Sequence, residues 1–137
     1  MQRRLVLVAA AALVRGDGRV LLAQRPEGKP MSGLWEFPGG KVESGETPAI
    51  ALARELSEEL RISARVEDLR PFIFASHDYP DFHLLMPVFM CRNWSGDPSP
   101  AEGQAVVWAS GDEIRDFAVP PADEVIIERY VQWWGTR

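Results

Sequence analysis

Residues 39–62 read "GGKVESGETPAIALARELSEELRI", which predicts a glycine turn followed by an acidic helix. Thr47 is a favourable N-cap, because its side-chain oxygen can accept a hydrogen bond from a free backbone N–H of the first turn. Pro48 suits the first helical position, where the N–H that proline lacks has no partner within the helix. We therefore expect a helix from about Thr47 to Leu60, immediately after Glu46.

Three carboxylates lie on one face of this predicted helix. Glu55, Glu58 and Glu59 are spaced i, i+3 and i+4, so they lie on adjacent turns. The opposite face is apolar and should pack on a sheet; it consists of Ala49, Leu52, Ala53, Leu56 and Leu60. Each like-charge pair costs only a few tenths of a kcal/mol, so a solvated acidic face with Arg54 paired to Glu58 is one explanation. A divalent cation is the other, because Mg²⁺ prefers oxygen ligands and shares them with substrate phosphates.

The glycine turn before the helix favours the cation. Gly39 and Gly40 let backbone groups approach a ligand closely. Lys41 places a positive charge where it can meet the charge of a phosphate group. The segment thus combines oxygen ligands for a metal ion with contacts for a phosphate.

The same segment resembles the signature of the Nudix hydrolases, G-x5-E-x7-R-E-U-x-E-E-x-G-U, in which U is a bulky apolar residue. The matching positions are Gly40, Glu46, Arg54, Glu55, Leu56, Glu58, Glu59 and Ile62. One position departs from the signature, because Arg61 stands where the family has a glycine that ends the helix. Arg61 must therefore adopt the left-handed conformation, at a cost of about 1–2 kcal/mol, or the helix must end differently.

The resemblance implies hydrolysis of a nucleoside diphosphate linked to another group, with Mg²⁺, or Mn²⁺ in its place, as cofactor. It assigns Glu55, Glu58 and Glu59 as metal ligands, with the Gly39 carbonyl oxygen as a further ligand. Arg54 is expected to orient a glutamate through a charge-assisted hydrogen bond. Glu46 is expected to lie near the metals or to bond Arg54.

A carboxylate must also take the proton of the attacking water. Glu58 and Glu59 are candidates, and Glu102 is a third, as general base and as metal ligand. Glu102 lies in "SPAEGQAVVW", which resembles the segment that places a glutamate near the metals in MutT-type members. A solvated loop carboxylate is the alternative for Glu102.

The resemblance extends to the MutT branch through "GRVLLAQRP", "GLWEFPGGKVESGET" and "VPPADEVI". Members of this branch remove oxidised nucleoside triphosphates such as 8-oxo-dGTP, and typically carry Asn at the start of the last helix to contact the base. This chain has Asp123 there, and ionised Asp only accepts hydrogen bonds. Asp123 suits either the N7–H of 8-oxoguanine or the N4 amine of cytosine. A carboxylate that merely meets the helix dipole is the plainer explanation.

We therefore expect a pyrophosphohydrolase that converts 8-oxo-dGTP into a nucleoside monophosphate and pyrophosphate, with cytidine triphosphates as the alternative substrates. Arg25 and Phe37 are expected near the base or sugar, and Gly40 and Lys41 at the substrate, although Phe37 would equally suit the core. A non-catalytic nucleotide-binding module is the alternative of another class. Such modules tend to lose signature glutamates, and all are present here.

Composition excludes several other functions. The net charge of −5 argues against a non-specific grip on nucleic acid, which needs a basic face. No apolar run is long enough to span a membrane. Cys91 is the only cysteine, so no intrachain disulfide can form, which fits a reducing cytoplasm. The start, "MQRRLVLVAAAALVR", has features of a signal peptide, but we favour a buried strand because it runs directly into a turn and a second strand.

The 137 residues suit a single domain, here predicted as one Nudix hydrolase domain over 1–137, either monomeric or a homodimer. We expect strands at about 3–14 and 18–25 to form a hairpin, and "LWEFPGGK" to be a short strand that runs into a glycine turn. Further strands are expected at 65–76, 82–92 and "QAVVWAS". A short helix is expected at 111–116, and a last helix from near Pro121 to about Trp134. This order favours an α+β fold, which in this family is a mixed sheet sandwiched between helices.

Overall fold

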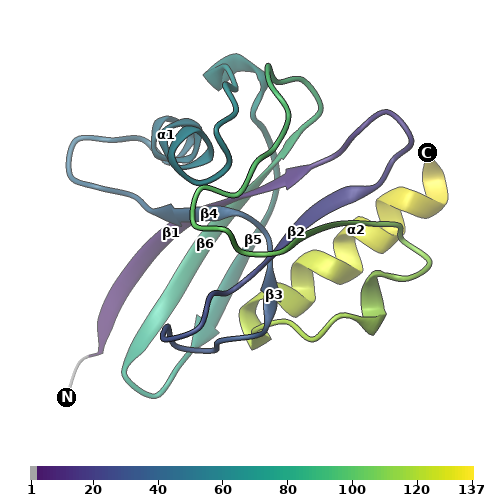
Figure 1. The fold of residues 1–137 in the computed structure, drawn as a ribbon. Coiled ribbons are helices and arrows are strands. Elements are labelled where there is room, and N and C mark those ends of the chain that lie inside the picture. Colours follow the sequence, from purple (N-terminus) through teal and green to yellow (C-terminus); the bar gives the residue numbers. More distant parts are fainter. Residues whose placement is uncertain (1–2) are drawn as a thin grey trace.

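The computed structural model describes residues 3–137, in which strands and helices are mixed as an α+β fold requires. The larger sheet has four strands in the order β4-β1-β6-β5. These strands are β1 (Arg4–Leu13), β4 (Gly39–Lys41), β5 (Arg70–Asp78) and β6 (Phe82–Cys91). β1 and β6 are parallel, whereas the other two pairs are antiparallel, so the sheet is mixed (Figure 1).

A second, smaller sheet is antiparallel and has the order β3-β2-β7. Its strands are β2 (Val20–Gln24), β3 (Trp35–Glu36) and β7 (Val106–Ala109). The prediction that the first two strands pair as a hairpin is therefore wrong, except at the turn between them. Only Val14 and Val20 bridge β1 to β2. Both edges of β1 are already occupied by β4 and β6, so β2 has no edge of β1 left to pair with.

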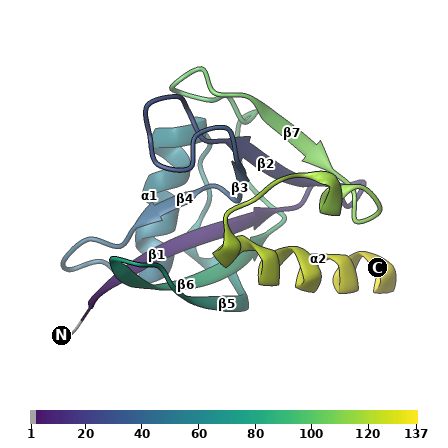
Figure 2. The ribbon, with the colours of Figure 1, turned by 90° about the horizontal axis from the view of Figure 1, so that it is seen from below.

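Two helices cover opposite sides of the strands. α1 (Pro48–Leu60) lies on one side and α2 (Glu124–Thr136) on the other, as Figures 1 and 2 show. One apolar cluster joins α1 to β1 and β2, and a second joins α2 to both sheets. The sandwiched arrangement that the sequence predicts is confirmed. No helix within residues 3–137 is long and apolar enough to cross a membrane.

Several predicted boundaries shift. The strand predicted at 65–76 is instead the 3-10 helix η1 (Val66–Asp68) followed by β5, which continues to Asp78. The helix predicted at 111–116 is a single 3-10 turn, η2 (Ile114–Asp116). The last helix begins as a 3-10 turn, η3 (Pro121–Asp123), before α2.

The ends of α1 follow the local sequence. The Thr47 side chain accepts a hydrogen bond from the Ile50 N–H at 3.2 Å, which confirms the N-cap. At the other end, Arg61 adopts the left-handed conformation with φ 57° and ψ 33°. The helix thus ends as it would at a glycine, and Arg61 carries the conformational cost. Leu52, Leu56 and Leu60 are buried as predicted, with Ala51 in addition.

The glycine pair lies in a strand rather than in the predicted turn. Gly39 and Gly40 belong to β4 and pair with Ala10 and Ala9 of β1. A Cβ atom on Gly39 would overlap the Ala9 carbonyl oxygen, and one on Gly40 would overlap the Glu55 carboxyl group. The glycines therefore provide close approach of β4 to β1 and α1, and not a reversal of the chain.

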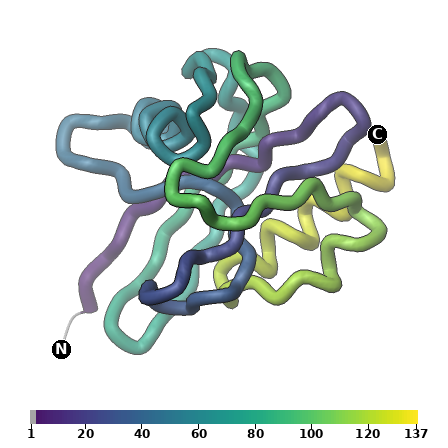
Figure 3. The backbone as a smooth tube through the Cα atoms, viewed as in Figure 1, coloured from purple at the N-terminus to yellow at the C-terminus, as the bar shows by residue number. Residues whose placement is uncertain are grey.

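The C-terminal helix is tied to the β1–β2 turn. Figure 3 shows the C-terminal end beside this turn. The Tyr130 hydroxyl donates to the Gly18 carbonyl oxygen at 2.6 Å and lies 3.1 Å from the Ala109 carbonyl oxygen. These buried contacts fix α2 against both sheets, and with it the residues that precede α2.

Because β4 has no room for a side chain against β1, Gly39→Ala should destabilise the fold. We expect a loss of about 1–3 kcal/mol in the free energy of unfolding, the usual cost of overpacking, measured by chemical denaturation. Gly16→Ala is the matched control, because nothing lies within 4 Å of its added Cβ atom. It should change the stability by less than about 0.5 kcal/mol. Equal effects of the two substitutions would contradict the close packing of β4.

Candidate active site

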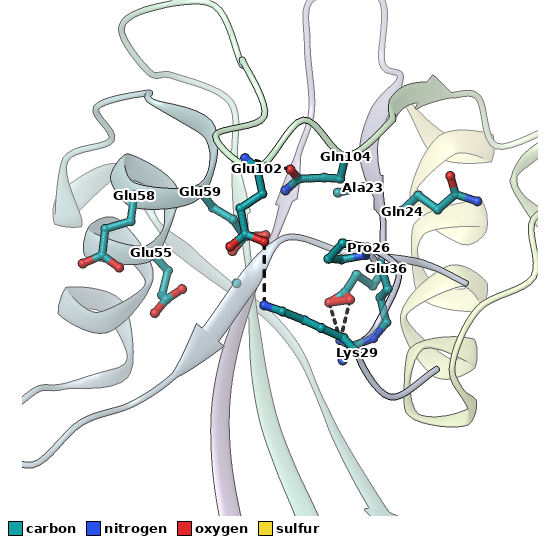
Figure 4. A pocket seen from close by; sticks show the side chains of 12 residues that line it. Ala23, Gln24, Pro26, Lys29, Glu36, Glu55, Glu58, Glu59, Glu102 and Gln104 are labelled. Carbon is teal, nitrogen blue, oxygen red and sulfur yellow. Dashed lines mark hydrogen bonds and ion pairs between the residues drawn. The ribbon is translucent and has the colours of Figure 1, made fainter. Parts of the chain in front are cut away.

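A cleft opens between α1, the smaller sheet and two loops. Its acidic end has a volume of about 250 Å³. The residues that line it are Ala23, Gln24, Arg25, Pro26, Lys29, Glu36, Gly39, Glu55, Glu58, Glu59, Glu102 and Gln104. All five predicted metal ligands line this end, namely Gly39, Glu55, Glu58, Glu59 and Glu102. Figure 4 shows the four glutamates.

The carboxylates of this end come from two segments far apart in the chain. Glu55, Glu58 and Glu59 project from α1, and Glu102 reaches the cleft from the loop between β6 and β7. Across the cleft, the Lys29 ammonium lies 3.7 Å from a Glu102 carboxylate oxygen. Glu102 is therefore held by an exposed ion pair, whose contribution to stability is small.

Arg54 and Glu46 line neither end of the cleft but organise its acidic side chains. The Arg54 guanidinium donates to both carboxylate oxygens of Glu46, at 2.8 and 2.9 Å. It also donates to Glu55 at 2.8 Å and to Glu58 at 3.3 Å. The bidentate pair lowers the pKa of Glu46 to about 2. Arg54 thereby fixes the orientation of Glu55 from the side away from the cleft.

Glu59 has the most perturbed carboxyl group of the acidic end. Burial raises its pKa to about 8, and the neighbouring Glu36, Glu55 and Glu102 carboxylates add to the rise. Desolvation and like charges both disfavour the ionised form. A cation in the acidic end would oppose both causes, because its positive charge would stabilise the ionised carboxylate.

The donor set fits a hard divalent cation, which takes carboxylate and carbonyl oxygens. Among residues 3–137, however, no group of three or more His, Cys, Asp or Glu side chains stands close enough to hold a metal ion. The reason is visible in the ion pairs, since Arg54 holds Glu55 and Lys29 holds Glu102.

The other end of the cleft is larger and largely apolar, with a volume of about 570 Å³. It shares Arg25, Lys29, Glu36 and Gly39 with the acidic end, so the two ends are continuous. The predicted substrate-binding residues that line it are Arg25, Phe37, Gly40, Lys41 and Asp123. Its apolar walls come from Val6, Val8, Met31, Tyr79, Phe82, Leu84 and Met86. An apolar pocket beside a charged one suits a flat base attached to phosphates.

Asp123 is the buried polar group of this apolar end, with only 6% of its surface exposed. Its Oδ2 atom accepts a hydrogen bond from the Phe37 N–H at 3.2 Å. Burial raises its pKa to about 7, against the lowering effect of that hydrogen bond. No fully buried side-chain N or O atom among the described residues lacks a hydrogen-bond partner, so Oδ1, for which no hydrogen bond is found, is not fully buried. Asp123 is the N-cap residue of α2 but makes no side-chain cap hydrogen bond there.

Sequence analysis missed Glu36, which lies between the two ends. Its carboxylate accepts two hydrogen bonds from the Arg25 guanidinium, at 2.7 and 3.1 Å, and burial raises its pKa. Arg25 also donates to the Pro30 carbonyl oxygen at 2.7 Å, so its N–H groups are largely occupied. The signal was a Glu flanked by Trp35 and Phe37, a charge within an otherwise apolar stretch.

Two aromatic residues from the β5–β6 turn complete the apolar end. Tyr79 and Phe82 stack with ring centroids 5.2 Å apart. The Tyr79 hydroxyl accepts a hydrogen bond from the Ala122 N–H at 3.2 Å, which links this turn to η3 beside Asp123. Sequence analysis gave Phe82 no role, because its place at the cleft depends on how β6 pairs with β1.

The chain is similar to known proteins in both sequence and fold. Residues 9–129 match the family described as NUDIX domain. The chain is 37% identical to a CTP pyrophosphohydrolase of Escherichia coli, over 92% of each protein. It is 36% identical to an 8-oxo-dGTP diphosphatase of Haemophilus influenzae, over 94% of this chain and 93% of that protein. The structure of a MutT NUDIX hydrolase from Burkholderia pseudomallei superposes with a TM-score of 0.82 at 29% identity, over 93% of this chain and 98% of that one.

The raised pKa of Glu59 predicts how the metal-free protein responds to pH. Glu59 keeps its proton in the folded chain up to about pH 8, whereas the unfolded chain releases it near the usual value of 4.5. The free energy of unfolding should therefore fall as the pH rises through this window and level off above it. Asp123, with a pKa of about 7, acts in the same direction, so the decline above pH 7 belongs to Glu59.

The measurement is urea denaturation in EDTA between pH 5 and pH 9. Glu59→Gln should flatten the decline above pH 7, because the amide does not titrate. Glu67→Gln, in the exposed η1 turn, is the control and should keep the decline. A decline that persists unchanged in Glu59→Gln would show that another group causes it.

Proposed function

The chain belongs to the NUDIX domain family, and we propose that it is a metal-dependent pyrophosphohydrolase of nucleoside triphosphates that favours 8-oxo-dGTP. The observation that carries this proposal is the continuous cleft, in which an acidic end adjoins an apolar end that contains a buried Asp123. The first end suits a triphosphate with a divalent cation, and the second suits a purine base. The products would be a nucleoside monophosphate and pyrophosphate.

The proposed cofactor is Mg²⁺, with Mn²⁺ as a substitute of the same ligand preference. The residues that would hold it are the Gly39 carbonyl, Glu55, Glu58, Glu59 and Glu102. When bound, such a cation neutralises phosphate charge and lowers the pKa of a coordinated water. The single buried cysteine, Cys91, is consistent with work in a reducing cytoplasm, either as a monomer or as a homodimer.

The chain's own residues would position the substrate and move one proton. Lys41, at the mouth of the apolar end, is placed to meet a phosphate charge. Arg54 would keep Glu55 oriented through the 2.8 Å hydrogen bond. The proton of the attacking water would pass to Glu58, Glu59 or Glu102, which all face the acidic end.

Asp123 supports the assignment of the base. Because the Phe37 N–H occupies Oδ2, the other oxygen is free to accept from N7–H of 8-oxoguanine. Guanine itself has an unprotonated N7 and would offer only an acceptor there. The same oxygen would accept from the N4 amine of cytosine, and the similarity to a CTP pyrophosphohydrolase keeps cytidine triphosphates as the second candidate.

Removing one carboxylate of the acidic end should abolish most activity. Glu58→Gln and Glu59→Gln should each lower kcat by at least about 100-fold, because the amide cannot neutralise a cation or take a proton. Circular dichroism should show an unchanged fold. Glu67→Gln removes the same charge far from the cleft and should keep full activity. Unchanged turnover in both cleft variants would contradict the assignment of these carboxylates to the metal site.

A substrate panel tests the base. With purified protein and Mg²⁺, kcat/KM should be highest for 8-oxo-dGTP and at least about tenfold lower for dGTP, in line with one lost hydrogen bond that leaves a buried acceptor unpaired. Asp123→Ala should abolish this preference and affect dGTP little. If CTP or dCTP exceeds 8-oxo-dGTP instead, Asp123 contacts the N4 amine and the cytidine alternative is correct.

A further inference from the structure

A second concave site lies between the ends of β5 and β6 and the C-terminal half of α2. It has a volume of about 290 Å³. Its lining residues are Asp68, Arg70, Pro71, Phe72, Met90, Arg92, Asn93, Arg129 and Trp133. Three arginines, Arg70 of β5, Arg92 just after β6 and Arg129 of α2, thus line one pocket. We call it the arginine pocket.

None of these three guanidinium groups is neutralised. Among residues 3–137, Arg70, Arg92 and Arg129 form no ion pair and no side-chain hydrogen bond, whereas Arg54 and Arg115 do. The one acidic lining residue, Asp68, is already paired with Arg65 at 3.0 Å. In a chain with a net charge of −5, the pocket is therefore a local concentration of unpaired positive charge.

Aromatic rings hold two of the guanidinium groups in place. The Arg92 guanidinium lies 5.4 Å from the centre of the Trp133 ring, and that of Arg129 lies 4.8 Å from the centre of the Phe72 ring. Such cation–π contacts restrain the side chains without using their N–H donors. The N–H donors stay available for an anion. Because these side chains are already restrained, binding an anion would cost less side-chain conformational entropy.

The arginine pocket is separate from the cleft. It shares no lining residue with either end of the cleft. β6 joins the two sites, with Phe82 at the cleft and Met90 at the arginine pocket. Met86 also lines the cleft, so the nearest lining residues of the two sites on this strand are four residues, or roughly 13 Å, apart. α2 lies beside β5 (Figure 2).

We propose that the arginine pocket binds a small phosphate-bearing anion without the help of a metal ion. Guanidinium groups recognise phosphate oxygens through paired N–H donors, and three of them suit more than one negative charge. The volume is near the lower limit of about 300 Å³ for small-molecule sites, which fits pyrophosphate or a nucleoside monophosphate. The proposal does not rest on the activity of the cleft.

Isothermal titration calorimetry of the full chain in EDTA tests this proposal. Without a cation, the carboxylates of the acidic end repel phosphates, so binding at the cleft is suppressed. We expect pyrophosphate to bind with a millimolar or lower Kd at low salt. Arg92→Gln/Arg129→Gln should weaken this binding at least about tenfold, because two charge-assisted contacts are lost.

The control is Arg4→Gln/Arg61→Gln, which removes two charges outside the pocket and should leave the Kd unchanged. Titration with a nucleoside monophosphate and with inorganic phosphate distinguishes the sources. A monophosphate that binds much more tightly than inorganic phosphate indicates a nucleotide site that uses the aromatic rings. Tighter pyrophosphate indicates a site for polyphosphate alone. No binding of any of the three, or binding that the pocket substitutions do not weaken, would overturn the proposal.

Discussion

The absence of side chains at Gly39 and Gly40 is the constraint on which the site depends. These residues allow β4 to lie directly against the backbone of β1 and against the Glu55 carboxyl group. The chain passes from Phe37 through Pro38 into β4, so a single short segment lines both ends of the cleft. The spacing between the proposed phosphate and base positions is therefore set by backbone contacts, which are stiffer than side-chain contacts.

Electrostatics divides the acidic residues into two groups. Arg54 lowers the pKa of Glu46 and donates a hydrogen bond to Glu55, so both side chains are oriented before any ligand arrives. Glu59 has no arginine partner, is half-buried, and is protonated near neutral pH. A cation in the cleft would thus gain most from Glu59 and would have to displace a proton from it.

What the sequence predicts depends on whether the deciding contacts are local. Both ends of α1 were predictable, because Thr47 acts within one turn and Arg61 adopts the conformation that the helix end requires. The strands that pair with β1 were not predictable, because β4 and β6 take its two edges only when the whole sheet assembles. Glu36 escaped notice for the same reason, since its partner Arg25 meets it through the pairing of β2 with β3. The signature residues could be assigned roles by resemblance, and the pairs of Arg54 with Glu46 and with Glu58 were among the predictions. The ion pair between Lys29 and Glu102 required the structure.

Asp123 illustrates what burial adds to a residue type. From sequence it is an ionised acceptor, but with a pKa of about 7 its ionised and protonated forms coexist near neutral pH. Since the Phe37 N–H is bound to Oδ2, the proposed discrimination between bases would depend on the other oxygen and its proton. A base that offers a donor there stabilises the ionised form and lowers the pKa of Asp123, whereas a base that offers an acceptor stabilises the protonated form and raises it. The apolar walls around it cannot distinguish hydrogen-bonding edges. The choice of base and the protonation of Asp123 are therefore thermodynamically linked, and each must shift the other by the same free energy.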